Sequence, residues 1–393
     1  MCRRSFIYFF NMTAKFNLKT VLIFASLAIF VWACSGSGGS TPQPEPTDAG
    51  KDRKAVLVNL ADNIIIPSYN SYKTKLDAMV IKSDAFRANP DAASLSEFRL
   101  AWVDAYTEWQ KVELFDVGPG FQQALRSYCN IYPANVTGIE AQIANPALSM
   151  ETASSYDRQG FPALDYLLNG VGNTDAEIIG YYTAAGEGAK RAAYLKRITD
   201  HMQLLLNSVI GDWAGTYREQ FTTKTGVDVG SPMGELVNRY VLHYERYIRS
   251  GKFGIPSGAM LNGVVSADKV EGFYKKDISK ILAQTAHQAA ADFFNGKSVK
   301  TGTEGPSFKT YLDALLVKDK TSGKLLSQLI NDQFAVSKSK IDALNSNFYK
   351  EVTTNDQAMK DVYTELQKAV RMLKVDMTSA MSITITYTDN DGD

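Results

Sequence analysis

Apolar residues recur at intervals of three and four along most of the chain from Ala55 onward, the spacing that places them on one face of a helix. The clearest series is Leu95, Phe98, Trp102, Tyr106, Trp109 and Glu113. Because each step is three or four residues, these side chains are predicted to form one helical stripe whose last member is a carboxylate. The sequence Gly118-Pro119-Gly120 predicts the end of this helix.

Further helices are predicted from the same spacing. They span residues 163–169, 192–210, 233–249, 268–295, 325–350 and 356–377. Apolar and polar residues alternate strictly only at residues 382–388, where Ile383-Thr-Ile-Thr-Tyr387 is typical of a strand. Strands and helices do not alternate along the chain, which disfavours a doubly wound sheet. We therefore predict an all-α fold of two packed helical bundles with a short strand-like C-terminal tail.

Glycine and proline residues predict how this helical body divides. They interrupt the helical spacing at residues 222–232 and again at residues 252–262. The first interruption predicts an N-terminal helical bundle at residues 55–220 and a C-terminal bundle with the tail at residues 221–393. A chain of this length can bury a large core, as one large domain or as two ordinary ones.

The first 33 residues have the features of a bacterial secretion signal. Lys15 and Lys19 precede an almost wholly apolar stretch at residues 21–32, which is shorter than the roughly 20 residues that cross a bilayer. The stretch ends in Trp32-Ala33-Cys34, which resembles the cleavage site of bacterial lipoproteins, although tryptophan is unusual there. We expect residues 1–33 to be removed and Cys34 to carry the lipid.

Residues 34–54 are predicted to be a linker, flexible in its Gly/Ser-rich part and stiffer in its Pro-rich part. Residues 1–11 precede a second methionine, and we expect Met12 to be the true start. The implied location is the bacterial cell envelope, with the lipid in the outer membrane and the protein on its periplasmic or surface side. The alternative is a buried helix followed by a loop.

Composition and charge narrow the function classes. The chain has 393 residues, with Lys+Arg 42, Asp+Glu 42 and 45% hydrophobic residues. Such a chain is neither disordered nor a nucleic-acid binder, because it lacks the positive charge that phosphate backbones require. Residues 1–33 contain four basic residues and no acidic one, so their removal leaves a formal net charge of −4. Membrane attachment is therefore expected through the lipid rather than through a basic surface.

The cysteine content excludes a disulfide framework and a four-thiolate zinc site, because the chain has Cys 3. If Cys2 is removed and Cys34 is lipidated, only Cys129 remains as a thiol. A single thiol in an oxidising envelope is expected to be a small buried hydrophobic residue. The alternative, a nucleophile, would need a nearby base.

The histidines do not form a familiar catalytic motif. The sequence lacks H-E-x-x-H, G-x-S-x-G, Walker A and G-x-G-x-x-G signatures. His201, His243 and His287 are too widely spaced to favour a His-rich zinc site. His201 and His287 lie in polar helical contexts and are predicted to be at the surface. His243 borders an apolar face, which favours either a hydrogen-bonded histidine at a bundle interface or a metal or substrate contact.

Two carboxylates fall on predicted apolar faces. Glu113 ends the aromatic stripe, and Asp165 lies four residues after Phe161 and three before Leu168. A buried carboxylate must be paired, hydrogen-bonded or metal-bound, so both are candidates for one common polar site. The alternatives are a helix-end residue for Glu113 and an anion stabilised near a helix N-terminus for Asp165.

The C-terminal sequence Asp389-Asn-Asp-Gly-Asp393 begins like a calcium-binding loop. It lacks the later ligands of the twelve-residue pattern. We therefore interpret it as a solvated acidic tail, with weak ion binding as the alternative.

Three segments, taken in order, resemble the imelysin family. The first is Phe98–Glu113 followed by Gly118-Pro119, the second is Arg158–Gly170, and the third comprises Glu235–Asn238, His243-Tyr-Glu245 and Gly251–Gly258. They are similar to the opening helix, the signature segment and the second-half segments of the family. The similarity covers the chain from about Ala55 to its C-terminus.

The resemblance implies an all-helical, two-bundle protein of the bacterial envelope with its candidate site between the bundles. The family was named as a metallopeptidase, and several members are linked to iron regulation or uptake. Its signature is G-x-H-x-x-E, of which this chain keeps Gly160 but has Pro162 for the histidine and Asp165 for the glutamate. Proline has no ligand atom and no backbone donor, so the histidine's ligand role cannot be carried over. Asp165 could still coordinate a metal ion, although its side chain is one methylene shorter than that of the signature glutamate.

These observations favour a lipid-anchored, non-enzymatic binding protein whose site lies in the cleft between the bundles. Its ligand would be iron, another metal ion such as zinc or calcium, haem or a small molecule. A second hypothesis is a metal-dependent, metallopeptidase-like hydrolase that uses Glu113, Asp165 and His243, with Glu113 and Asp165 as metal ligands. A third is a scaffold whose aromatic helix face binds another envelope protein.

Overall fold

The computed structural model describes residues 49–388, which belong to one compact unit. The predicted signal sequence, the lipidation residue Cys34, most of the linker and the acidic residues 389–393 lie outside the described residues. Within residues 49–388, no helix combines the length and the hydropathy that a bilayer crossing requires.

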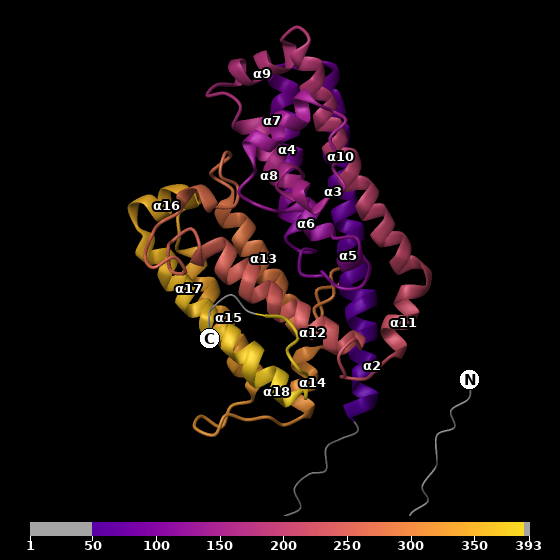
Figure 1. Ribbon diagram of the computed structural model, residues 1–393. Coiled ribbons are helices and arrows are strands. Elements are labelled where there is room, and N and C mark those ends of the chain that lie inside the picture. Colours follow the sequence, from indigo (N-terminus) through magenta and orange to yellow (C-terminus); the bar gives the residue numbers. More distant parts are fainter. Residues whose placement is uncertain (1–48, 389–393) are drawn as a thin grey trace, which may run out of the picture. The chain divides into compact units, whose positions relative to one another are not determined.

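The first half of the described chain is a set of packed helices. α2 (Ala49–Asn59) continues through the π-helical η1 (Leu60–Ile65) into α3 (Ile66–Ala88), and a tight turn leads to α4 (Ala92–Trp109). Shorter helices follow: α5 (Pro119–Gln122), α6 (Leu125–Cys129), α7 (Val136–Ala144), η2 (Ala153–Arg158), α8 (Gly160–Asn169) and α9 (Asp175–Thr183). α10 (Glu187–Asp212) then packs along α3, which also packs on α4 (Figure 1).

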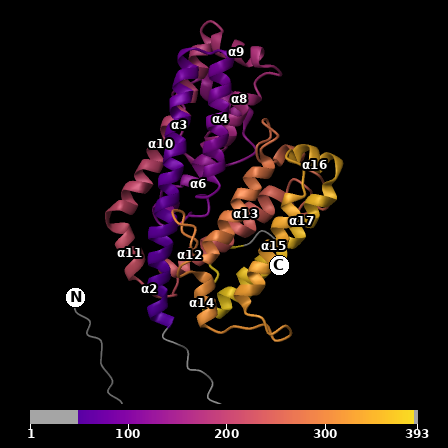
Figure 2. The same cartoon turned by 180° about the vertical axis from the view of Figure 1, so that it is seen from behind.

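The second half forms another helical group. Its elements are η3 (Trp213–Tyr217), α11 (Arg218–Thr223), α12 (Pro232–Leu242), η4 (His243–Gly254), η5 (Ala267–Lys269), α13 (Ser279–Asn295), α14 (Phe308–Ala314), α15 (Leu326–Asp342), α16 (Phe348–Thr354), α17 (Asp356–Arg371), η6 (Met372–Met377) and α18 (Thr378–Ala380). η4 packs on α13 and α17, and α15 packs on the same two helices. α13, α15 and α17 lie close together in both ribbon views (Figures 1 and 2). The two groups meet where α13 contacts α4 and where α2 contacts α11, α12 and α14.

The predicted all-α fold is confirmed, since no strand occurs within residues 49–388. The strand-like tail alternates in burial as predicted, with Ile383 buried and Thr384 exposed, but it pairs with no other strand. A side-chain amide takes the place of the neighbouring strand. Asn238 Nδ2 donates to the Thr384 carbonyl at 2.9 Å, and Asn238 Oδ1 accepts from the Thr386 N–H at 2.8 Å.

The predicted aromatic stripe is confirmed on α4, but the helix is shorter than predicted. Asp91 caps its N-terminus by accepting the Ser94 N–H, and the apolar members of the stripe are buried in the core. The helix ends at Trp109, and residues 110–114 form turns. Glu113 therefore lies on an irregular segment beyond the helix rather than on its stripe.

Three other predicted helices are interrupted or shortened. The segment 268–295 is α-helical only from Ser279, after the short 3₁₀ turn η5, because Gly272 and Lys276 have positive φ and turn the chain before α13. Residues 343–347 separate α15 from α16 within the predicted helix 325–350, and η4 replaces the end of the predicted helix 233–249. The proposed division into bundles 55–220 and 221–393 stays a prediction.

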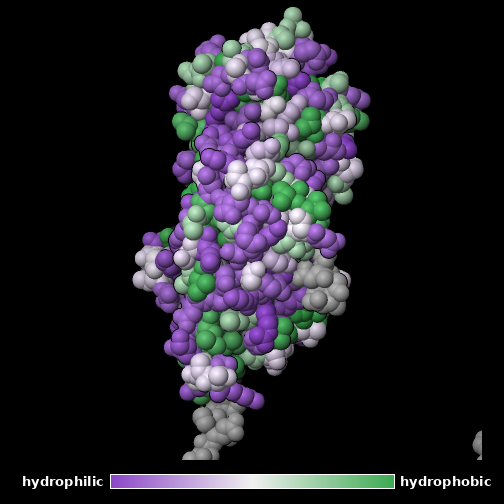
Figure 3. Space-filling model, turned by 90° about the vertical axis from the view of Figure 1, so that its left-hand side faces the viewer, coloured by the Kyte–Doolittle hydropathy of each residue, from purple (hydrophilic) through white to green (hydrophobic). Residues whose placement is uncertain are grey.

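The exposed apolar side chains are scattered. Ile81, Leu100 and Leu204 are each more than 60% exposed, and they come from three different helices. Figure 3 shows hydrophobic residues in small groups among hydrophilic ones on the face that it displays. Single exposed apolar residues of this kind are ordinary on a protein surface.

Candidate functional site

The structure brings two of the candidate residues, Glu113 and His243, together, whereas the common polar site was predicted for Glu113 and Asp165. Glu113 lies in the turns after α4, and His243 is the first residue of η4. His243 Nε2 lies 3.5 Å from Glu113 Oε2, and both side chains are buried. Neither ring nitrogen of His243 has a hydrogen-bond partner within the described residues. Such an unsatisfied buried group is costly, so its presence requires an explanation.

The charge state of Glu113 follows from its surroundings. Burial favours the neutral acid, but the contact with His243 and the positive charges of Lys252 and Arg126 outweigh burial. Together they lower the pKa of Glu113 to about 2. Glu113 is therefore an ionised carboxylate at neutral pH.

Glu113 belongs to a larger group of buried polar side chains, which we call the buried polar cluster. Its members are Tyr106, Gln110, Glu113, Asn130, His243, Lys252 and Glu271. Asn130 joins the two carboxylates, because its Nδ2 donates to Glu113 Oε1 at 3.0 Å and to Glu271 Oε1 at 2.9 Å. The Tyr106 hydroxyl lies 2.7 Å from Asn130 Oδ1 and fixes the orientation of this amide.

Lys252 supplies the positive charge of the buried polar cluster. Its ammonium forms an ion pair with Glu271 and donates to Gln110 Oε1 at 2.7 Å. Gln110 Nε2 in turn donates to Glu271 Oε1 at 3.0 Å. Lys252 and Glu271 are each 2% exposed, so water cannot replace these contacts. Gln110 comes from the first half of the chain and Lys252 from the second, so the ion pair and the amide connect the two helical groups.

Lys252 and Glu271 are site residues that the sequence analysis missed. Lys252 fell in a predicted interhelical break, and Glu271 in a helix predicted at residues 268–295. The structure places Lys252 on the π-helical η4 and Glu271 in the turns before α13. The Gly251–Gly258 segment of the family resemblance was the one available signal for Lys252. Wide π-helical turns are frequently found at functional sites.

Asp165 is buried as predicted but has different partners from Glu113. Its Oδ2 accepts from the Tyr274 N–H at 2.9 Å, and its Oδ1 accepts from the Lys275 N–H at 2.9 Å and from Asn169 Nδ2 at 3.1 Å. Among the residues that the structure describes, no hydrogen bond or ion pair joins Asp165 to Glu113 or His243. Burial raises the pKa of Asp165 to about 7, although the two backbone donors favour its carboxylate. Asp165 anchors the loop that follows Glu271.

The other candidate residues, His287, His201 and Cys129, lie apart from the buried polar cluster and have partners of their own. His287 is buried, contrary to the predicted surface position, because α13 is enclosed by its neighbours; its Nε2 lies 3.0 Å from the Phe334 carbonyl. His201 is half-buried, with its Nδ1 2.7 Å from Gln159 Oε1. Cys129 is buried and free as predicted, and burial raises the pKa of its thiol to about 12. Its thiol is therefore protonated at neutral pH, which argues against a nucleophile.

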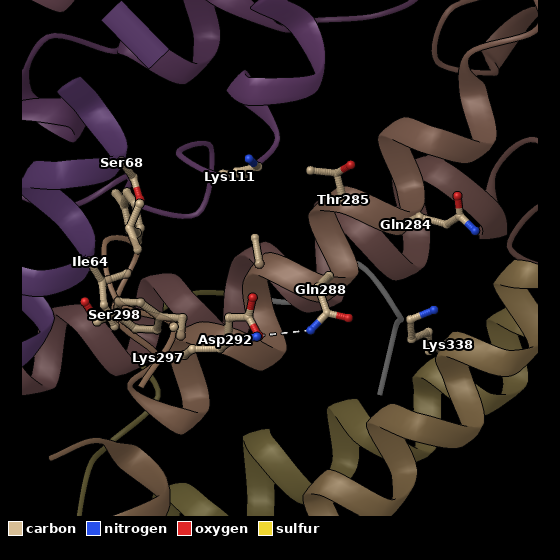
Figure 4. A pocket seen from close by; sticks show the side chains of 15 residues that line it. Ile64, Ser68, Lys111, Gln284, Thr285, Gln288, Asp292, Lys297, Ser298 and Lys338 are labelled. Carbon is tan, nitrogen blue, oxygen red and sulfur yellow. Dashed lines mark hydrogen bonds and ion pairs between the residues drawn. The ribbon is translucent and has the colours of Figure 1, made fainter. Parts of the chain in front are cut away.

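A pocket of about 570 Å³ lies between elements of the two helical groups, and we call it the interbundle pocket (Figure 4). One wall comes from η1, α3 and the turns after α4, and the other from α13, α15 and the loop after α13. Its lining residues are Ile64, Ser68, Lys111, Phe115, Gln284, Thr285, Gln288, Ala289, Asp292, Phe293, Lys297, Ser298, Val299, Gly302 and Lys338. It therefore combines an apolar floor with a polar rim.

One short segment connects the interbundle pocket with the buried polar cluster. In the turns after α4, Gln110 and Glu113 face the cluster, whereas Lys111 and Phe115 line the pocket. Phe115 is fixed from both sides, since its carbonyl accepts the Tyr69 hydroxyl at 3.0 Å and its ring lies 5.5 Å from that of Phe293. Because the backbone at residues 110–114 is irregular, neighbouring side chains can face the buried polar cluster on one side and the interbundle pocket on the other.

Comparison with known proteins decides the family. The family model described as Imelysin matches residues 65–377, which is most of the chain. The chain belongs to the imelysin family. The match confirms the resemblance that three short segments of the sequence indicated.

Two solved structures share this imelysin's fold. A putative iron-regulated protein A precursor from Parabacteroides distasonis is 17% identical, covers 86% of this chain and 98% of its own, and superposes with a TM-score of 0.67. An imelysin-like protein from Psychrobacter arcticum is 16% identical, with the same coverages and a TM-score of 0.65. At these identities the likeness shows the fold alone. No curated protein matches the chain.

The imelysin signature of this chain has a clear packing role. Gly160 has a φ of +73°, and a Cβ on it would lie 2.2 Å from the Cys129 carbonyl oxygen, so only glycine fits. This close approach sets the end of α6, which Asn130 of the buried polar cluster directly follows. Pro162 lies in the first turn of α8, where the helix requires no backbone donor.

The signature residues of this imelysin do not fit a resident metal ion. Pro162 offers no ligand atom, both oxygens of Asp165 already accept backbone N–H groups, and Glu113 is held by Asn130 and His243. Among residues 49–388, no group of three or more His, Cys, Asp and Glu side chains is arranged to hold a metal ion. The arrangement instead supports hydrogen bonding and ion pairing within the protein.

Proposed function

We propose that this imelysin is a non-enzymatic binding protein of the bacterial cell envelope that takes part in the uptake of iron, another metal or haem. Its ligand would lie in the interbundle pocket. The observation that supports this proposal most directly is the pocket itself, whose volume of about 570 Å³ lies in the range of about 300–1,000 Å³ that is typical of small-ligand sites. The link with iron rests on the family and on the neighbour described as a putative iron-regulated protein.

Binding is favoured over hydrolysis by the state of the buried polar cluster. A metal-dependent hydrolase needs about three protein ligands and an open position for water. Here Glu113 is 3% exposed, and Glu271 is already neutralised by Lys252. The observation that would favour the hydrolase is His243, whose ring nitrogens have no hydrogen-bond partner within the described residues.

Equilibrium titration tests the proposal. A form spanning residues 46–393, the compact unit that contains all described residues, is titrated with ferric citrate, zinc and calcium salts, and hemin. We expect saturable binding of at least one probe below about 1 mM. Ala289→Trp should abolish that binding by filling the pocket, whereas Ala335→Trp on the exposed face of α15 should not. Binding of none of these probes would remove the proposal.

Activity assays separate the competing functions. Proteolysis that is abolished by a chelator and by Glu113→Gln would favour the hydrolase. A protein that copurifies with the full chain, and that binds residues 46–393 when no small ligand has been added, would favour the scaffold hypothesis. We expect neither result.

We also propose that a lipid on Cys34 holds the protein at the membrane. The proposal is supported by the sequence Trp32-Ala33-Cys34 and by the linker that follows it. In cells, the wild-type chain should sediment with the membrane fraction, and Cys34→Ser should shift it to the soluble fraction. An unchanged distribution of the variant would contradict the anchor.

A further inference from the structure

The rim of the interbundle pocket is positively charged. Lys111, Lys297 and Lys338 lie at different edges of the pocket, and each comes from a different element (Figure 4). Among the described residues that line the pocket, Asp292 is the one acidic residue. A ligand in the pocket therefore faces three ammonium groups and a single carboxylate, on a chain whose formal net charge is +0.

The three lysines are available to a ligand. Each forms one ion pair at present, Lys111 with Glu108 at 2.7 Å, Lys297 with Asp292 at 3.4 Å and Lys338 with Asp342 at 2.6 Å. The three lysine side chains are 43–48% exposed. The pairs of Lys297 and Lys338 are solvent-exposed on both sides and therefore weak. Asp292 and Asp342 are 35% and 39% exposed, so their carboxylates stay solvated when an anion recruits Lys297 or Lys338. Glu108 is 11% exposed, so Lys111 is the costliest of the three lysines to recruit.

The floor of the pocket favours an aromatic or aliphatic body on the ligand. Phe115 and Phe293 form the base with their rings 5.5 Å apart, and Ile64 and Ala289 extend the apolar surface. None of the lining residues is His, Cys, Met or Tyr, and three lysines repel a bare cation. A metal ion would therefore reach this pocket only inside an anionic organic ligand.

We propose that the interbundle pocket binds an amphipathic organic anion, with its acidic groups on Lys111, Lys297 and Lys338 and its apolar body on Phe115 and Phe293. This inference rests on the proposed function, because it specifies the ligand class of the same pocket. A porphyrin with carboxylate side chains and an aromatic ferric chelate both satisfy this chemistry.

A matched pair of fluorescent probes tests the charge requirement. Anilinonaphthalene sulfonate and N-phenylnaphthylamine share the same aromatic rings and differ by the sulfonate. We expect the form spanning residues 46–393 to bind the sulfonate at least tenfold more tightly than the uncharged probe. Raising the ionic strength should weaken the binding of the sulfonate but not that of the uncharged probe, because salt screens the contacts of the sulfonate with the lysines. Zinc chloride alone should not compete.

Variants assign the effect to individual lysines. Lys111→Gln, Lys297→Gln and Lys338→Gln should each weaken sulfonate binding about fivefold, the effect of removing one charge about 4 Å away in water. Lys82→Gln is the matched control, because Lys82 forms a similar exposed ion pair with Glu97 at 2.7 Å and does not line the pocket. It should leave the affinity for the sulfonate unchanged.

The outcomes separate this inference from the proposed function. If both probes bind equally and the lysine variants have no effect, the inference of an anionic ligand is overturned, whereas the proposal of a binding pocket remains. Sulfonate binding that survives Ala289→Trp places the anion elsewhere and also overturns the inference. If neither probe binds, and the metals and hemin do not bind either, the proposed function fails as well.

Discussion

Replacing Lys252 with methionine should destabilise the protein far more than the loss of an ordinary surface lysine. Lys252 is 2% exposed and forms an ion pair with Glu271, which is also 2% exposed. Lys252→Met keeps most of the side-chain volume and removes the cation. Glu271 Oε2 then lacks its partner, and Gln110 Oε1 loses the donor that lies at 2.7 Å.

The expected cost follows from this uncompensated buried charge. Removing one partner of a buried ion pair typically costs about 3–5 kcal/mol, which includes the unpaired acceptor left behind. The control is Lys75→Met, which breaks an ion pair with Asp104 whose side chains are 45% and 60% exposed. That change should cost about 0.2–1 kcal/mol. Urea unfolding followed by circular dichroism measures both differences.

A double variant tests the physical cause. Lys252→Met combined with Glu271→Gln removes both charges, so its cost should be well below the sum of the two single costs. A cost of Lys252→Met equal to that of Lys75→Met, or additive single costs in the double variant, would refute the reasoning.

Other residues give further expectations. Gly160→Ala should cost about 1–3 kcal/mol in urea unfolding, because φ is positive and the Cys129 carbonyl is too close, whereas Gly180→Ala, with open space around it, should be neutral or stabilising. The raised pKa of Asp165, about 7, means that the folded chain keeps a proton that the unfolded chain releases. The unfolding free energy should therefore fall between about pH 4 and 7, by at most about 1.4 kcal/mol per pH unit, and Asp165→Asn should lack this fall. Asn238→Ala should speed hydrogen exchange of the Thr386 amide without unfolding the protein; unchanged exchange would show that the amide does not hold the tail.

The sequence was sufficient to predict the fold class because helical periodicity is a local property. The stripe on α4 is buried as expected. The ends of helices were less predictable. Gly272 and Lys276 delay the start of a predicted helix through positive φ, and a lysine in that conformation has no sequence signature. The tail has the alternation of a strand, but its partner, Asn238, is more than 100 residues away in sequence.

The candidate site was only partly predictable for a similar reason. Glu113 and His243 were found because each lies on or beside an apolar face, and the structure brings them within 3.5 Å of each other. Lys252 and Glu271 were missed because a charged residue in a predicted interhelical break or helix is usually solvated, and only the tertiary structure shows that both are buried. Asp165 was correctly placed in the interior, but its partners are backbone N–H groups of a distant loop. Periodicity cannot reveal such partners.

The cost of burying charges in the buried polar cluster is understandable if the cluster positions the interbundle pocket. Lys252 and Glu271 both hold Gln110, and the next residue, Lys111, is at the rim of the pocket. A short turn such as residues 110–114 would otherwise be ordered only on ligand binding, at an entropic cost to affinity. Because the two helical groups are joined at this turn, both walls of the pocket are fixed before a ligand arrives. If the proposed function holds, we therefore expect the buried ion pair to preorganise the interbundle pocket more than it stabilises the fold.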